Sequence, residues 1–211
     1  MDLDPASVPW QVVYKLMIGA IVPRPIGWIS TVDELGQPNL APFSFFNAAC
    51  ADPPTVLFCP MIRGADRATK DTLNNIRATG EFVVNIVTEP LAAAMNLSST
   101  ELPAGVNEFK RSGLTAAPSA TVRPPRVAES PIHFECKLHQ LIELGTEPGG
   151  GSVVLGRVVH LHAAAAVLYD GDKVDLTKLK PIGRLAGSAY CRVTDLFEMQ
   201  RPPSEVPRAG Y

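Results

Sequence analysis

The chain has 211 residues, 46% of them hydrophobic, and its 19 Lys and Arg against 21 Asp and Glu give a net charge of −2. This balance offers no basic face to neutralise a nucleic-acid backbone, which excludes nucleic acid as a partner. Uncharged stretches such as Val158–Tyr169 are shorter than the roughly 20 apolar residues of a membrane span, and the acidic start Met1–Asp4 is unlike a signal peptide, so we predict a cytoplasmic protein without membrane association.

Short apolar runs separated by prolines and glycines predict the first strands. Ile26–Val32 is followed by a turn at 33–37 and by Pro38–Ala41, and together they predict a β-hairpin. Thr55–Cys59 is a continuous apolar run between prolines, which is typical of a strand buried on both sides. Glu81–Val87 has the same character.

The second half of the chain predicts two more strands. Ile132–Leu138 alternates strictly between apolar and polar side chains. Gly151–Val167 is apolar on both faces, so part of it should lie under another element or a second subunit. Helix signals are few: Thr72–Ala78 follows the capping residue Asp71, and Pro90–Leu97 begins with proline.

These elements predict one domain over residues 1–211, all-β with two or three short helices, in which residues 198–211 form a C-terminal tail. Strand and helix do not alternate regularly enough for a doubly wound parallel sheet. The mean hydropathy of +0.10 lies on the apolar side for a globular protein. We therefore expect a second subunit to cover the surplus apolar surface.

Metal and nucleophile chemistry find little support in the sequence. The four cysteines form no CxxC pair and are expected to be reduced, buried thiols. His160 and His162 share one face of a predicted strand but have no acidic or Cys partner nearby in sequence, so we predict no metal. No Gly-x-Ser-x-Gly elbow occurs, and no Ser/His/Asp grouping is signalled.

The segment Arg63–Thr72 is the first candidate for ligand binding. It concentrates three cations and two hydroxyls before a helix start, where backbone N–H groups favour a phosphate. It lacks the glycines of a P-loop or Rossmann fingerprint. The alternative is a solvated polar turn in which Asp71 is an ordinary helix cap.

Two further segments could face a planar ligand. In Asn39–Asn47, aromatic and small polar residues alternate and the prolines limit ladder hydrogen bonds, so backbone groups and hydroxyls could reach a ring. The alternative is that its phenylalanines are core residues. In Arg24–Thr31, Gly27 permits close approach, but Ser30 and Thr31 point to opposite faces of the strand.

These segments in this order resemble the flavin reductase-like, FMN-binding split-barrel family, and in particular its flavoredoxin-like branch. The resemblance runs from about Trp10 to Phe197 and rests also on Lys70–Ile76, Pro124–Pro131 and Gly183–Tyr190. It implies a Greek-key split β-barrel and a homodimer that binds FMN near the subunit interface.

The resemblance also assigns roles to the candidate residues. It implies that Lys70 and Thr72, with Arg63, hold the phosphate, and that Tyr190 closes the site. The residues implied along the isoalloxazine are Ser44, Phe45, Phe46 and Asn47, and those implied to flank the ring or ribityl chain are Trp28, Ser30 and Thr31. No catalytic side chain is required, because the flavin itself stores the electrons.

The activity implied is that of an FMN-dependent oxidoreductase that takes a hydride from NAD(P)H and reduces flavin or another small acceptor. The alternatives are electron transfer with a redox-protein partner and a non-catalytic FMN-binding module. Two-component reductases of this family often carry Gly-Asp-His before the long C-terminal strand, whereas Gly149–Ser152 stands here. The glycines could still admit a nicotinamide ring by close backbone approach.

Overall fold

The computed structural model describes residues 1–64, 66–103 and 105–206 and has at its centre a seven-stranded antiparallel sheet with the strand order β2-β1-β5-β8-β9-β4-β3. The strands are β1 (Gly27–Val32), β2 (Pro38–Phe43), β3 (Phe46–Cys50), β4 (Thr55–Phe58), β5 (Glu81–Ile86), β8 (Ile132–Glu143) and β9 (Ser152–Ala163). All strands predicted from the sequence are present. Three two-stranded ribbons complete the β-structure: β6 (Ala116–Ala117) with β7 (Arg126–Val127), β10 (Leu168–Tyr169) with β11 (Lys173–Val174), and β12 (Ile182–Arg184) with β13 (Tyr190–Arg192).

The sheet curls into a split barrel because its two edges are consecutive in the chain. β2 and β3 lie at opposite edges of the strand order, yet only Ser44 and Phe45 separate them. The Phe45 carbonyl accepts from the Cys59 amide at 2.8 Å, which fixes this connection next to the end of β4. We call Pro42–Phe45 the seam. The predicted all-β split-barrel fold is confirmed.

Two apolar clusters lie on the two sides of β1. Inside the barrel, Ile29 packs with Phe58 and Phe82 and with Leu73 of α2 (Asp71–Thr79). Outside, Trp28 belongs to a cluster that α3 (Ala92–Leu97), α4 (Glu108–Arg111) and β12 complete. β1 is therefore buried along its whole length.

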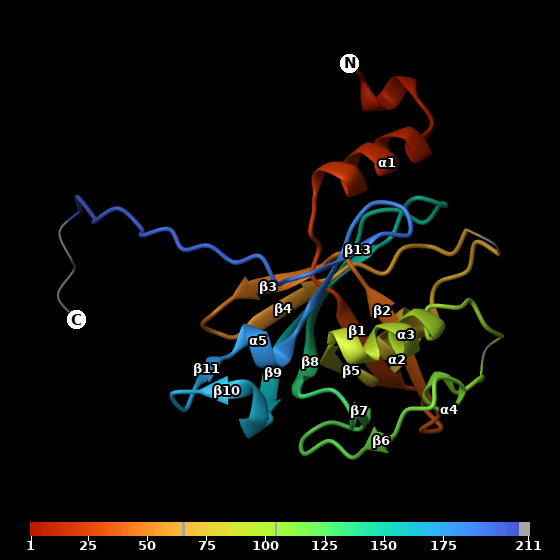
Figure 1. Cartoon of the computed structure of the whole chain (residues 1–211). Helices are drawn as coiled ribbons and strands as arrows, with labels where there is room; N and C mark the ends of the chain where they lie inside the picture. The colour runs from red at the N-terminus through yellow and green to blue at the C-terminus, as the bar shows by residue number, and fades with distance from the viewer. Residues whose placement is uncertain (65, 104, 207–211) are drawn as a thin grey trace.

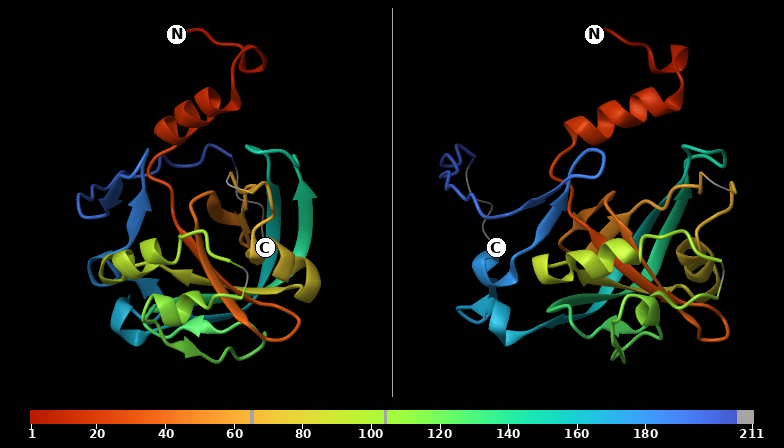
Figure 2. Two further views of the ribbon diagram at one scale, coloured as in Figure 1. Left: turned by 90° about the vertical axis from the view of Figure 1, so that its right-hand side faces the viewer. Right: turned by 45° about the vertical axis from the view of Figure 1, so that its right-hand side comes forward.

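Helix α1 (Trp10–Ala20) stands apart from the barrel in both views of Figure 2. The sequence did not predict it, because only Ile18 in the helix is buried and its apolar residues follow no narrow stripe. The predicted helical segments 72–78 and 90–97 are confirmed, the second as η2 (Glu89–Leu91) followed by α3. The expectation of two or three helices is wrong, since the described residues also form α1, α4, α5 (Leu176–Leu179), η1 (Pro5–Ser7) and η3 (Ala165–Val167).

A long segment, 118–130, covers the outer face of the sheet below β5 and β8 (Figure 1). Polar side chains from the strands hold its backbone: Glu135 accepts from the Ala120 and Thr121 amides, and Asn85 accepts from the Val127 amide. The polar face of the alternating strand β8 is therefore buried in part. Glu135 is 0% exposed.

The C-terminal segment runs away from the body as an extended chain from about residue 193 (Figure 1). Residues 207–211 of the predicted tail lie outside the described residues. No described helix is long and apolar enough to cross a membrane.

Candidate functional site

Three adjoining hollows form one cleft between α1, the seam and the start of α2. Their volumes are ≈ 340, ≈ 220 and ≈ 90 Å³. The first two share Tyr14 and Ser44, and the first and third share Arg63 and Lys70. Pro42 lines all three. We call this composite surface the seam cleft.

The start of α2 supplies the cationic end of the seam cleft. Lys70 is the residue before the helix, and the described residues offer its ammonium group no hydrogen bond or ion pair. Burial lowers the pKa of Lys70, an effect that the carboxylate of Glu101 opposes. The amide groups of Asp71 and Thr72 have no acceptor among the described residues either, as expected for the first turn of a helix. Two backbone N–H donors without a described acceptor and the partly desolvated ammonium group of Lys70 therefore lie together at the start of α2.

Arg63 lies beside Lys70 and is restrained by carboxylates. Its guanidinium group pairs with Asp71 at 3.1 Å and with Asp66 at 3.5 Å, and its side chain is only 14% exposed. It lines the cleft next to Lys70. Such a planar, preorganised cation is suited to an anionic oxygen.

Arg24 fixes the geometry on the α1 side. Its guanidinium group donates to the carbonyls of Ile18 and Ile21 at 2.7 and 3.0 Å, and so holds the C-terminal end of α1. It also donates to the Leu185 carbonyl at 3.0 Å and to the Ser44 hydroxyl at 3.4 Å. One nearly buried side chain therefore joins α1, the β12–β13 ribbon and the seam.

Tyr190 bounds the cleft on the third side. The Arg184 guanidinium group lies 4.5 Å from the centre of its ring, and its hydroxyl lies 3.5 Å from Asn96 Oδ1. A neighbouring hollow of ≈ 470 Å³ shares Tyr190 and Met95 with the seam cleft. Tyr190 thus separates two hollows.

Six of the eleven predicted site residues line the seam cleft. They are Ser44, Phe45, Arg63, Lys70, Thr72 and Tyr190. Thr72 is 1% exposed, and its hydroxyl donates to Asn39 Oδ1 at 2.8 Å.

The other five predicted residues lie elsewhere. The Trp28 indole donates to the Ser98 hydroxyl at 2.9 Å, and the Ser30 hydroxyl donates to the Pro125 carbonyl at 2.5 Å. Thr31 accepts from Asn75 at 3.0 Å on the opposite face. Phe46 packs onto Gly27, where an added Cβ would lie 2.7 Å from its ring, and Asn47 is exposed on β3. None of these five lines a hollow of the seam cleft.

Sequence reasoning missed the contribution of α1. Trp10 and Tyr14 line the ≈ 340 Å³ hollow of the seam cleft, with exposed fractions of 42% and 37%. Arg24 and Arg184 were part of quoted segments but were not assigned to the site. No common pattern in the sequence marks these four residues, since Trp10 and Tyr14 lie well before the first predicted strand and Arg184 lies well after the last. Only the tertiary fold shows that the four side chains converge.

The glycines at 149–151 are already in close contact with the protein. An added Cβ on Gly149 would lie 2.6 Å from the Trp10 ring, and one on Gly151 would lie 2.6 Å from the Pro60 carbonyl oxygen. The turn also pairs with the loop after β4, since the Ile62 amide donates to the Gly150 carbonyl at 3.0 Å. This turn therefore forms the outer wall of the seam cleft next to α1.

The histidines lie away from the cleft, on β8 and β9. His162 Nε2 lies 2.6 Å from Glu135 Oε1, and the ring of His160 lies 4.5 Å from that of His162. Within residues 1–64, 66–103 and 105–206, no group of three or more His, Cys, Asp and Glu residues could hold a metal ion.

Comparison with known proteins places this cleft in context. Residues 18–176 match the family described as flavin reductase like domain. An uncharacterised protein of Halalkalibacterium halodurans is 40% identical over 96% of this chain and 97% of its own length. Nitrilotriacetate monooxygenase component B from Bacillus cereus superposes with a TM-score of 0.88 at 34% identity, covering 94% of this chain and 98% of that one. The 2-nitrobenzoate 2-nitroreductase of Pseudomonas fluorescens superposes with a TM-score of 0.85 at 31% identity and covers 100% of both chains.

Proposed function

Because the chain belongs to the flavin reductase like domain family, which makes it a flavin-related oxidoreductase, we propose that it binds FMN in the seam cleft, accepts a hydride from NADH or NADPH and reduces a flavin or another small acceptor. The observation that carries this proposal is the meeting of Lys70 and the first amides of α2, for which the described residues offer no partner, with the aromatic seam.

The residues of the cleft fit a flavin mononucleotide. Lys70 and the amides of Asp71 and Thr72 would hold the phosphate, because a helix N-terminus and a cation both favour negative charge. Pro42 and Phe45 offer an apolar wall to a planar ring, and the Ser44 hydroxyl offers a hydrogen bond to its edge.

When bound, FMN supplies the two-electron chemistry. The protein's own groups then act by binding and orientation. Arg24 holds the seam and α1 at a fixed separation, and α1 shields the cleft from water on one side. Glu108 lines the proposed phosphate end of the cleft; burial raises its pKa, and its carboxyl oxygens accept hydrogen bonds from the Asn39 side-chain amide and the Leu40 backbone amide.

We further propose that the protein is a homodimer. Apolar side chains are exposed on three elements of one chain: Met17 and Ile21 at α1 and its end (45% and 57%), Leu161 on β9 (57%), and Phe197 in the C-terminal segment (82%). Burying them against a second copy would remove unfavourable contact with water. The exposure of Leu161 supports the expectation that β9 lies partly under a second subunit.

Electron transfer with a redox protein is the second candidate. It is favoured by Gly149–Ser152, which stands where Gly-Asp-His accompanies nicotinamide use in related reductases, and by the Trp10 indole that already covers Gly149. A donor protein would need no nicotinamide pocket.

An anaerobic absorption experiment tests the proposal. The purified protein should show flavin bands, with a maximum near the usual ~450 nm, that bleach on addition of NADH or NADPH. Bands that persist with both nucleotides but bleach with dithionite would favour the redox-protein partner. A protein that binds no FMN when FMN is supplied would refute the proposal.

A further inference from the structure

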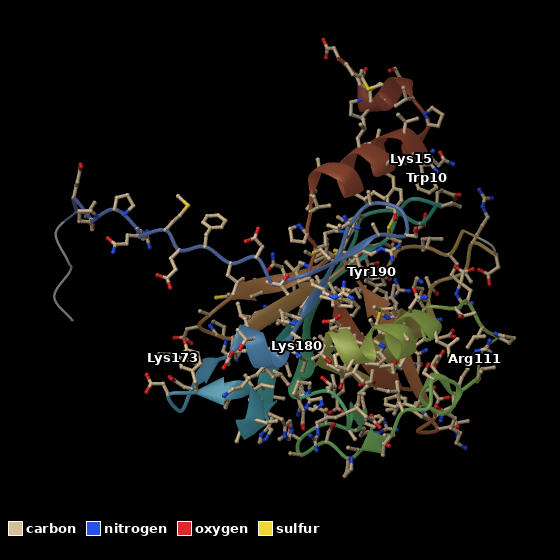
Figure 3. All side chains as sticks on the ribbon, in the orientation of Figure 1. Trp10, Lys15, Arg111, Lys173, Lys180 and Tyr190 are labelled. Carbon is tan, nitrogen blue, oxygen red and sulfur yellow. The ribbon has the colours of Figure 1, made fainter. Side chains whose placement is uncertain are left out.

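Helix α1 carries an aromatic pair that faces the seam cleft from outside the barrel. The rings of Trp10 and Tyr14 lie 6.0 Å apart in an edge-to-face arrangement, and both line the ≈ 340 Å³ hollow of the seam cleft. Figure 3 shows Trp10 on α1, above the body of the molecule and on the same side as Tyr190. A partly exposed indole over a cleft is an apolar surface without a complete partner.

The backbone beneath it fixes the position of the Trp10 indole. Gly149 has φ +95° and lies directly against the indole, since a Cβ there would come within 2.6 Å of Trp10 Cδ2. Any other residue at 149 would displace the ring. Arg24 holds the other end of the helix, so α1 is attached at both ends and cannot swing away without breaking one of these contacts.

The two walls of the hollow differ in chemistry. The inner wall consists of Phe43, Phe45 and Lys70, where the proposed FMN would lie, and the outer wall consists of Trp10, Tyr14 and Gly149. The flavin face turned away from the barrel would thus look toward α1. Arg184 and Arg24 line the adjoining hollow and favour an anionic ligand.

We propose that Trp10 is the stacking platform of a second binding subsite. Its indole takes the planar heteroaromatic ring of the molecule that exchanges electrons with the flavin, and this molecule carries its ring on a phosphate-bearing chain. A nicotinamide dinucleotide and a second flavin nucleotide share this chemistry. The inference rests on the proposed function and deepens it by naming the subsite for the exchange partner.

The test uses FMN-loaded wild-type protein and the variants Trp10→Leu, Gly149→Ala and Gly171→Ala. Gly171 is the matched control, because it also has a positive φ (+86°) but has nothing within 4 Å of an added Cβ. Calorimetric titrations of the protein carrying oxidised FMN are made with NAD⁺, whose aromatic ring has no hydride to donate, and separately with excess FMN. Binding of FMN itself is measured on the apoproteins.

Trp10→Leu and Gly149→Ala should weaken binding of one of the two probes by about fivefold or more, which is the usual scale for loss of an aromatic stack. Gly171→Ala should bind both probes and FMN like the wild type, and in Trp10→Leu and Gly149→Ala the loss of affinity for the probe should exceed any loss of affinity for FMN. The probe that is weakened identifies the exchange partner. The same probe should also quench the part of the indole emission that Trp10→Leu removes, because the only other tryptophan, Trp28, is 0% exposed.

Three results would overturn the inference. Equal affinity of wild type and Trp10→Leu for both probes would exclude the platform while leaving the FMN site intact. A change of oligomeric state in Trp10→Leu, seen by light scattering, would make Trp10 an interface residue instead. Failure of the wild type to bind FMN would remove the proposed function, and this outcome is distinct from the other two.

Discussion

Lys70 is the residue on which the proposed phosphate site most depends. Replacing Lys70 by Ala should weaken FMN binding by about 1.5–3 kcal/mol, since a charge-assisted hydrogen bond in a partly buried site contributes on that scale. Titration followed by flavin fluorescence measures the change. Lys173→Ala removes the same charge from an exposed ion pair on the β10–β11 ribbon, far from Trp10 and Tyr190 in Figure 3, and should leave the affinity unchanged.

An unchanged affinity in Lys70→Ala would remove this lysine from the site. Equal loss in both variants would mean that only the net charge of the protein matters.

For single residues, the sequence predicted which residue types lie in the site better than it predicted which way their side chains point. Ser44, Phe45, Lys70 and Tyr190 do converge on one cleft. The flavin contacts predicted for Ser30 and Thr31 remain predictions, but their hydroxyls are engaged by the protein on the two covered faces of β1. A strand buried on both faces has no side that composition alone could mark as free.

The polar face of strand β8 contains Glu135, whose hydrogen bonds make the stability of the fold depend on pH. Burial opposes ionisation of Glu135, but hydrogen bonds from Thr121, Ala120 and His162 outweigh it and lower the pKa of Glu135 to about 2 from 4.5. A group whose pKa is lower in the folded state stabilises the protein above its unfolded pKa. That stabilisation is lost as the pH falls from 4.5 towards 2.

Glu135→Gln should therefore lower the free energy of unfolding by about 3 kcal/mol near pH 6, and the difference from the wild type should shrink as the pH falls below about 4. Urea unfolding at several pH values measures this difference. Glu198→Gln, at an exposed position in the C-terminal segment, serves as the control. If the difference in the free energy of unfolding stays constant down to pH 3, the charge of Glu135 is not what holds segment 118–130.

The observed bounds of the strands and helices show where sequence periodicity predicts an element correctly and where it does not. β1, β2 and β4 were predicted within two residues of each end, because prolines and a turn delimit them. β8 extends five residues beyond the predicted end at Leu138, since irregular pairing near residue 139 interrupts the alternation. α1 was missed because its apolar side chains find little cover within the chain.

At the scale of the whole molecule, the exposed apolar surface predicts self-association. Light scattering should give a mass of twice the 22.6 kDa of one chain. Leu161→Glu should weaken the dimer by about tenfold or more, because a carboxylate would be buried at the interface without a partner. Leu35→Glu is the control, since Leu35 is 87% exposed at the tip of the β1–β2 hairpin.

A monomeric wild type would refute the dimer. Dissociation by both substitutions would mean that added charge alone, regardless of position, separates the subunits. Composition alone predicts subunit association, but it does not predict the faces involved, because the sequence does not say which apolar residues the barrel leaves uncovered.

Binding of the proposed FMN at the seam would link cofactor supply to the turnover of the protein. Only two residues join the two edges of the barrel, and the proposed FMN would contact both the seam and α2, which closes the interior. Ligand that binds only the closed form adds RT ln(1 + [L]/Kd) to its stability. In a cell short of riboflavin, the empty barrel would therefore open more often, and proteases would remove the chain faster than they remove its flavin-loaded form.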